Sequence, residues 1–140
     1  MMVIADGAGG PIRDAYRLKG AATAVDAARA AGGQAHLVVG DVAQASQCQQ
    51  VVRETVEQFG QLNILFNNVG IQSRASYTNV EDTSEEMWDR ILDVNLKSYF
   101  LMSKYAIPEI RRQGGGVIIN TASVQGLQSQ RLVPAYAASK

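Results

Sequence analysis

Short apolar runs alternate with longer stretches of helical periodicity along this chain. The apolar runs are predicted to be β-strands, and they cover residues 2–5, 36–39, 62–66 and 117–119. Shorter helices are predicted at residues 21–31, which are rich in alanine, at residues 45–59 and after Pro134. Strands that alternate with helices indicate βα units and a parallel sheet, so the predicted fold class is α/β. Each strand is apolar throughout, as expected when helices cover both faces of a sheet.

A long helix is predicted to open at the capping box of residues 83–86, and Pro108, near its end, is expected to kink or close it. Its apolar side chains form two faces. One face carries Met87, Ile91, Val94, Leu101 and Tyr105, and the other carries Trp88, Leu92, Tyr99, Ala106 and Ile110. A helix that is apolar on two faces is expected to pack on both sides, against the sheet and against a further surface such as a partner subunit.

The composition excludes several classes of protein. The chain has 140 residues, the length of one domain, and 46% of them are hydrophobic, which is too many for a disordered chain. Its 13 Lys and Arg residues balance 13 Asp and Glu residues, so it lacks the surplus of positive charge that proteins use to bind nucleic acid. Cys48 is the only cysteine and His36 the only histidine, and we interpret both as structural rather than as metal ligands. With no apolar run long enough for a membrane span and no signal peptide, the chain is expected to be soluble and cytoplasmic.

Polar and glycine residues follow each predicted strand directly. They are Asp6, Asp41, residues 67–70 and residues 121–123. In an open parallel sheet the carboxyl ends of the strands share one edge, and ligands bind beyond that edge. The pattern therefore predicts a binding site there, without saying what binds.

Tyr136 and Lys140 form the most specific chemical signal in the sequence. They are four residues apart on the last predicted helix, so they share one helix face. A free tyrosine has a pKa of about 10, and a neighbouring cation favours the phenolate and lowers that value. Such a pair suits general acid/base chemistry near neutral pH. The motif is common by chance, so its meaning depends on the residues around it.

Those surroundings resemble the short-chain dehydrogenase/reductase family. The matching motifs are NNVG at residues 67–70, an asparagine in the next helix at Asn95, Ser123 after the following strand, and YAASK at residues 136–140. Their order and spacing match the family over roughly residues 35–140. The resemblance implies a Rossmann-like doubly wound parallel sheet, here partial with about four strands. It also implies an oxidoreductase that moves a hydride between NAD(P) and a carbonyl/alcohol substrate.

The resemblance also implies a role for each catalytic residue. Tyr136 would be the acid/base, and Lys140 would lower its pKa and hold the nicotinamide ribose. Ser123 would hydrogen-bond and orient the substrate oxygen. Asn95 would interrupt the hydrogen bonding of its helix and hold a water that relays protons through Lys140.

The implied cofactor contacts lie at the strand ends. Asp41 and Val42 match the adenine contacts of the family, and Asn67 and Gly70 match the backbone beside the adenine ribose. Asn67 could equally be a turn residue at the end of its strand. Asp6 would bond the adenosine ribose hydroxyls, which favours NAD and leaves NADP as a second possibility. No metal is implied, and the full-length protein is expected to be a homo-oligomer.

The start of the chain departs from the family pattern, which opens with a strand and a TGxxxGxG loop that binds pyrophosphate. Two registers are open. In one, residues 1–6 are the family's second strand; in the other, they are its first strand, and residues 6–13 are a damaged glycine loop. Only one confident helix fits between Pro11 and Gly33, which favours the second-strand register.

In the favoured register, residues 1–140 are a single partial domain that lacks the glycine-loop unit and the C-terminal substrate region. The family's sheet order is 3-2-1-4-5-6-7, so the missing first strand is central. Either the sheet has a gap, or the first run of this chain closes it. We predict the closed arrangement, with the run at residues 2–5 between those at residues 36–39 and 62–66, and residues 117–119 outermost.

Two hypotheses for the function follow from these observations. The first is an NAD(P)-dependent oxidoreductase. The alternative is a catalytically inactive, truncated fragment that binds a nucleotide or dimerises through its long helix. The set formed by Asn95, Ser123, Tyr136 and Lys140 favours the first, and the absent glycine loop favours the second.

Overall fold

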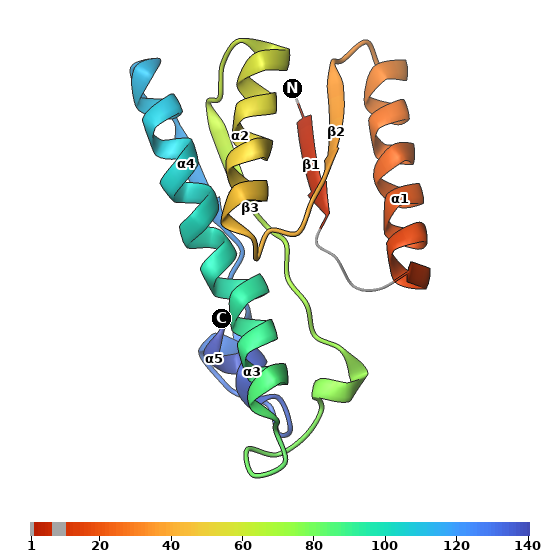
Figure 1. Cartoon of the computed structure of the whole chain (residues 1–140), viewed down its shortest axis with the longest axis vertical. Helices are drawn as coiled ribbons and strands as arrows, with labels where there is room; N and C mark the ends of the chain where they lie inside the picture. Colours follow the sequence, from red (N-terminus) through yellow and green to blue (C-terminus); the bar gives the residue numbers. More distant parts are fainter. Residues whose placement is uncertain (1, 7–10) are drawn as a thin grey trace.

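A computed structural model describes residues 2–6 and 11–140, with side chains from Gly20 onward. Calls on the glycines at residues 7–10, and on the side chain of Asp6, lie outside the described part of the chain. The strands are β1 (Met2–Asp6), β2 (Ala35–Val39), β3 (Ile64–Asn67) and β4 (Val117–Asn120). The helices are α1 (Pro11–Ala30), α2 (Ala45–Phe59), α3 (Glu85–Leu92), α4 (Ser98–Arg112) and α5 (Pro134–Ala138). Strands and helices alternate as predicted, and the α/β class is confirmed (Figure 1).

The strands form two separate parallel pairs. β1 pairs with β2, with Met2 opposite Ala35, and β3 pairs with β4, with Ile64 opposite Val117. The predicted closed sheet is therefore wrong, because β1 forms no ladder with β3. Local pairing explains the difference: β1, α1 and β2 complete one βαβ unit on their own, and α1 packs on both strands of that unit.

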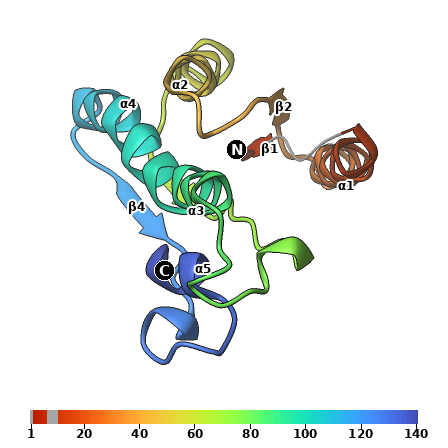
Figure 2. The same ribbon diagram turned by 60° about the horizontal axis from the view of Figure 1, so that its bottom comes forward.

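The main core lies between the two strand pairs, and α2 is its centre. Cys48, Val51 and Val52 of α2 are buried against a cluster that reaches from Val38 on β2 to Leu65 on β3. Ala106 and other apolar residues of α4 close the far side of this cluster, where α2 and α4 pack together. The two pairs are thus joined by helix packing rather than by backbone hydrogen bonds, and Figure 2 shows β4 apart from β1 and β2.

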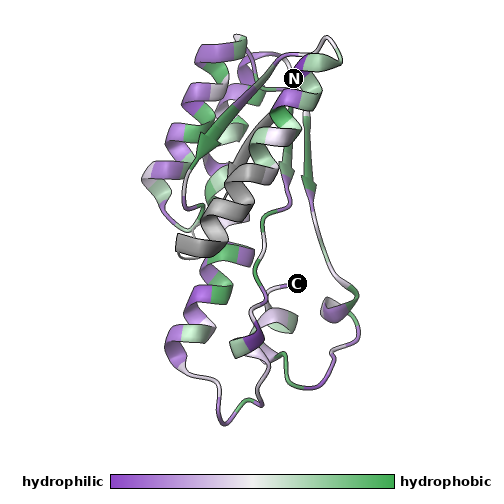
Figure 3. Cartoon of the chain, turned by 90° about the vertical axis from the view of Figure 1, so that its right-hand side faces the viewer, coloured by the Kyte–Doolittle hydropathy of each residue, from purple (hydrophilic) through white to green (hydrophobic). Residues whose placement is uncertain are grey.

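The strands of the second pair are not covered on both faces, contrary to the prediction from their apolar sequences. Ile64 and Phe66 of β3 are 62% and 60% exposed, and all four residues of β4 are exposed. Leu65 and Asn67 alternate with them and are buried against the helices. Figure 3 shows the apolar colour running along the strands while the helices alternate between polar and apolar.

Local signals set several element boundaries. α2 ends as predicted at Gly60, whose φ of 77° is in the left-handed region. α1 begins at Pro11, ten residues before the predicted start at Ala21, because proline is favoured in the first turn of a helix. The cap of α3 is Ser84, whose Oγ accepts a hydrogen bond from the Met87 amide. No helix among the described residues is long and apolar enough to cross a membrane.

Candidate functional site

The predicted long helix changes its hydrogen-bonding pattern where Asn95 lies. A π turn at Asp93–Lys97 lies between α3 and α4, and the helical backbone continues through it from Glu85 to Arg112, so the predicted long helix is present and extends past Pro108. The interruption of helical hydrogen bonding expected around Asn95 is present. A π turn inserts an extra residue into the helix, and such turns are frequent at functional sites.

The Asn95 side chain is fully buried and makes three hydrogen bonds. Its Oδ1 accepts from the Ile71 amide at 2.7 Å, and its Nδ2 donates to the Ile71 carbonyl at 3.0 Å. The same Nδ2 donates to the Ser139 Oγ at 2.9 Å. Asn95 therefore connects the loop after β3 to Ser139, the C-cap residue of α5, which is the helix that carries Tyr136. Figure 2 shows α5 beside α3.

Lys140 lies where three segments of the chain meet. Its Nζ donates to the Tyr99 hydroxyl and to the Thr121 carbonyl, each at 3.2 Å. A Cβ added to Gly70 would lie 3.4 Å from both the Lys140 Nζ and the Asn95 Oδ1. The bare backbone of Gly70 therefore borders the ammonium group, beside the polar residues that follow β3 and β4.

Tyr136 is half-buried on α5, which opens at Pro134. The Lys140 Nζ is 6.0 Å from the centre of the Tyr136 ring, within the range of a cation–π interaction. The two side chains are therefore close, as predicted, although α5 ends at Ala138 and Lys140 lies beyond the helix rather than on its face.

Ser123 caps the short 3₁₀ turn at Val124–Gly126. Its Oγ accepts a hydrogen bond from the Gln125 amide at 3.2 Å. The turn packs tightly on the end of α5, since a Cβ at Gly126 would overlap the Lys140 carbonyl. Close packing thus brings the Ser123 loop to the helix of Tyr136, although the two described side chains share no hydrogen bond.

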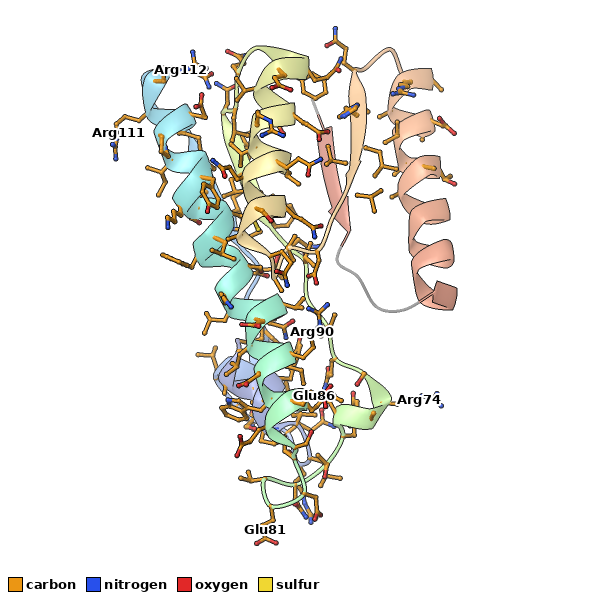
Figure 4. All side chains as sticks on the ribbon, in the orientation of Figure 1. Arg74, Glu81, Glu86, Arg90, Arg111 and Arg112 are labelled. Atoms are coloured by element: carbon orange, nitrogen blue, oxygen red, sulfur yellow. The ribbon has the colours of Figure 1, made fainter. Side chains whose placement is uncertain are left out.

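Asp41 and Val42 occupy the turn after β2, apart from the Lys140 cluster. The Asp41 Oδ2 is 3.1 Å from Nη1 of Arg90 on α3, and its Oδ1 accepts from the Ala43 amide at 3.0 Å. The Val42 side chain is 4% exposed and belongs to the core, so a ligand at this turn would meet the Val42 backbone. Figure 4 shows Arg90 on α3.

Asn67 and Gly70 differ in what they offer a ligand. The Asn67 side chain is 5% exposed and donates to the Asn120 Oδ1 at 2.9 Å, which links the ends of β3 and β4. Gly70 is exposed and, as described, adjoins Lys140. The side chain of Asn67 therefore has a structural partner, whereas the backbone of Gly70 is open.

Tyr99 and Thr121 are site residues whose contacts sequence reasoning missed. Both contact the Lys140 ammonium group, and both line a pocket of about 670 Å³ beside it, together with Leu96, Phe100 and Ser103. Tyr99 was assigned to an apolar helix face, but its position four residues after Asn95 is a signal that could have placed it beside α5. Within the described ranges, no group of three or more His, Cys, Asp or Glu residues could hold a metal ion.

Sequence comparison identifies the family. Residues 6–140 match the family model for short chain dehydrogenase. An uncharacterized oxidoreductase of Thermotoga maritima is 47% identical over 116 residues, which is 83% of this chain and 44% of that protein. The cyclohexanol dehydrogenase of Acinetobacter sp. (strain SE19) is 37% identical over 123 residues, which is 88% of this chain and 48% of that protein. The chain spans about half the length of these curated relatives.

Solved structures agree with the sequence matches. The crystal structure of a short chain dehydrogenase from Mycobacterium smegmatis superposes with a TM-score of 0.83 at 33% identity, covering 99% of this chain and 53% of the other. Levodione reductase superposes with a TM-score of 0.83 at 28% identity, covering 98% of this chain and 50% of the other. The fold is therefore a partial Rossmann fold, and the chain belongs to the short-chain dehydrogenase/reductase family.

Proposed function

We propose that this chain carries the catalytic residues of an NAD(P)-dependent oxidoreductase that acts on a carbonyl/alcohol pair. The observation that carries the proposal is the position of the Lys140 ammonium group, which lies 6.0 Å from the centre of the Tyr136 ring and borders the backbone of Gly70. An ammonium group at that position can donate a hydrogen bond to a ribose hydroxyl.

In this proposal the protein supplies the proton and the orientation. The Tyr136 hydroxyl delivers a proton to the substrate oxygen during reduction and takes it back during oxidation. Ser123 donates a hydrogen bond to the same oxygen, since its Oγ already accepts one from the Gln125 amide and keeps its own proton free. Asn95 keeps Ser139 and the loop at Ile71 fixed around this centre.

The residues present fit a nicotinamide dinucleotide on one side of the site. Lys140 provides an ammonium donor, and exposed Gly70 allows close approach of a sugar to the backbone. Asp41 and Val42 would contact the adenine, with Asn67 and Gly70 beside its ribose and Asp6 at the ribose hydroxyls, which favours NAD over NADP. When bound, the nicotinamide ring supplies or accepts the hydride.

We also propose that β1 corresponds to the family's second strand, so that residues 1–140 form a single domain without the glycine-loop unit or the C-terminal substrate region. The parallel pairing of β1 with β2, and not with β3, supports this register. In the other register β1 would be the first strand, which lies beside the fourth in the family's sheet.

The test of the proposed activity is the oxidation of a panel of secondary alcohols, including cyclohexanol, with NAD⁺ or NADP⁺, followed by the absorbance of the reduced cofactor. We expect slow turnover that Tyr136→Phe lowers by roughly a hundredfold or more. Tyr77→Phe is the matched control, because Tyr77 is 49% exposed and distant in sequence from the site. Equal turnover in wild type and Tyr136→Phe would contradict the proposed role.

A second candidate function is an inactive fragment that binds nucleotide or dimerises. The exposed apolar residues of the π turn and α4 favour it: Leu96, Phe100 and Ile107 are 52%, 62% and 39% exposed. They also support a homo-oligomer. A folded wild-type chain that shows no turnover with either cofactor, yet sediments as a dimer, would favour this second function.

A further inference from the structure

The Tyr99 hydroxyl, the Thr121 carbonyl and the Lys140 ammonium group form a closed triangle of hydrogen bonds. The Tyr99 hydroxyl donates to the Thr121 carbonyl at 3.3 Å, and the Lys140 Nζ donates to both oxygens at 3.2 Å. A phenol has one donor, and Thr121 takes it, so the phenol oxygen faces Lys140 as an acceptor. The triangle joins the start of α4, the end of β4 and the end of α5.

A neighbouring contact, between Asn95 and Ser139, accompanies the contact between Tyr99 and Lys140. Asn95 and Tyr99 are four residues apart, and they contact Ser139 and Lys140, which are adjacent on the facing segment. Asn95 lies within the π turn at Asp93–Lys97, and Tyr99 lies in the first turn of α4 that follows it. Two successive contacts therefore fix both the position and the rotation of the end of α5.

We propose that Tyr99 is a positioning residue of this site, whose hydroxyl holds the Lys140 ammonium group beside Gly70. Lysine has a flexible stem with four rotatable bonds, so a single acceptor leaves its ammonium group free to sample other positions. Tyr99 adds a second acceptor and presents its ring 5.2 Å from the same Nζ. The role of Tyr99 in catalysis rests on the proposed function, whereas its effect on Lys140 does not.

Tyr99→Phe is the informative change, because phenylalanine keeps the ring above Lys140 and removes only the hydroxyl. The readout is the rate at which trace acetic anhydride acetylates Lys140, measured by peptide mass spectrometry relative to Lys97 of the same chain. Lys97 is a suitable internal reference, since its side chain is half exposed and its ion pair is with Asp93 rather than with Tyr99. Tyr105→Phe is the matched control on α4.

We expect the relative acetylation rate of Lys140 to rise by about threefold or more in Tyr99→Phe and to stay unchanged in Tyr105→Phe. An unchanged relative rate in Tyr99→Phe would overturn the proposal. Should that variant fail to fold, the wild-type chain gives the second measurement. There Lys140 is expected to react more slowly than Lys97, and an equal or faster reaction contradicts the proposal.

A titration of the same proteins with NADH separates this proposal from the proposed function. Weaker NADH binding by Tyr99→Phe together with faster acetylation supports both. If wild type binds no NADH and Lys140 is still acetylated faster in Tyr99→Phe than in wild type, the role of Tyr99 in holding Lys140 is supported and the proposed cofactor site is contradicted.

Discussion

The two strand pairs of this protein have the same parallel geometry and very different surroundings. In the first pair, β1 and β2 are joined by α1, and the whole unit follows one continuous stretch of sequence. In the second pair, β3 and β4 are separated by α3, the π turn and α4, and the residues that follow them meet at Lys140. A parallel pair alone therefore does not make a site. In the second pair, the buried Asn95 side chain hydrogen-bonds both to the loop after β3 and to Ser139 at the end of α5, and the polar residues of the site lie beside these contacts.

The largest effect is expected from removing the Asn95 amide, on which the second pair depends. Asn95→Ala leaves the Ile71 amide and carbonyl without their partner in a buried environment. We expect a loss of about 3 kcal/mol in the free energy of unfolding, measured by urea denaturation. Asn79→Ala on the exposed loop is the control; it removes one exposed hydrogen bond, from the Asp82 amide to the Asn79 Oδ1, and is expected to change the free energy of unfolding by about 1 kcal/mol at most. Similar changes for both variants would mean that the Asn95 contacts do not stabilise the site.

A matched pair of valines compares the main core with the packing of α1, which lies outside it. Val94 is 0% exposed in the main core, whereas Val25 is 4% exposed on α1, outside that cluster. We expect Val94→Ala to cost about 2–3 kcal/mol and Val25→Ala about 1–2 kcal/mol in denaturation experiments. A larger cost for Val25→Ala would contradict the assignment of the main core to the cluster around α2.

Cys48 reports on α2, the helix that joins the two pairs. Its thiol is buried and donates to the Val42 carbonyl at 3.1 Å. Burial, and to a lesser degree the nearby Asp41 carboxylate, raises the pKa of Cys48 to about 11. Since the unfolded thiol has a pKa of about 8.5, the stabilising effect is complete below that pH and is lost as the pH rises toward 11.

We therefore expect the native chain to react with a thiol reagent far more slowly than the chain in denaturant at neutral pH. The measurement is the rate at which an aromatic disulfide reagent releases its coloured thiolate on reaction with Cys48, and Cys48→Ala is the blank. Rapid reaction of the native chain would show that the contact between α2 and β2 opens readily, and that the two pairs are less firmly joined than the core indicates.

The smallest effect is expected from Glu54, which links α2 to β2 at the surface. Its Oε2 is 3.5 Å from the His36 Nε2, and its Oε1 accepts from Gln50 at 2.7 Å. The hydrogen bond from Gln50, with a smaller contribution from His36, lowers the pKa of Glu54 below its ordinary value. A lowered pKa stabilises the fold above the unfolded value of about 4.3, and the stabilisation is lost as the pH falls.

The free energy of unfolding, measured as a function of pH, tests this point. Glu54→Gln is expected to change that free energy by less than about 1 kcal/mol near neutral pH and to weaken its pH dependence below about pH 5. Glu57→Gln, on the same helix, is the control. If the free energy of unfolding depends on acid pH in the same way in Glu54→Gln and in wild type, Glu54 does not stabilise the contact between α2 and β2.

The sequence carried enough information to locate α2 and the Tyr136–Lys140 pair. Helical periodicity is a local property, and Gly60 ends α2 where the left-handed conformation is required. The spacing of Tyr136 and Lys140 likewise indicates their proximity from local sequence, although α5 ends at Ala138, before Lys140. These features depend on residues close together in the chain.

The strand order and the contacts of Tyr99 depend on residues far apart in the chain. The predicted sheet placed β1 between β2 and β3. The pairing of β1 with β2 is confirmed, but no local signal in β1 shows whether β3 will also be its neighbour, and the pairing of β1 with β3 was predicted wrongly. The apolar sequence of β3 predicts burial, yet the alternating exposure of Ile64 and Phe66 arises from which elements pack nearby. Likewise, the ring of Tyr99 satisfies an apolar pattern while its hydroxyl makes the contact with Lys140.

The central claim is that the Lys140 centre binds a nicotinamide dinucleotide, and a fluorescence titration of the 140-residue chain with NADH tests it most directly. Wild type, Lys140→Met and Lys104→Met should all be shown to unfold cooperatively before they are compared. We predict saturable binding by wild type and by Lys104→Met, and binding weakened by about tenfold or more in Lys140→Met. No saturable binding by the folded wild-type chain, or equal binding by all three proteins, would contradict the claim.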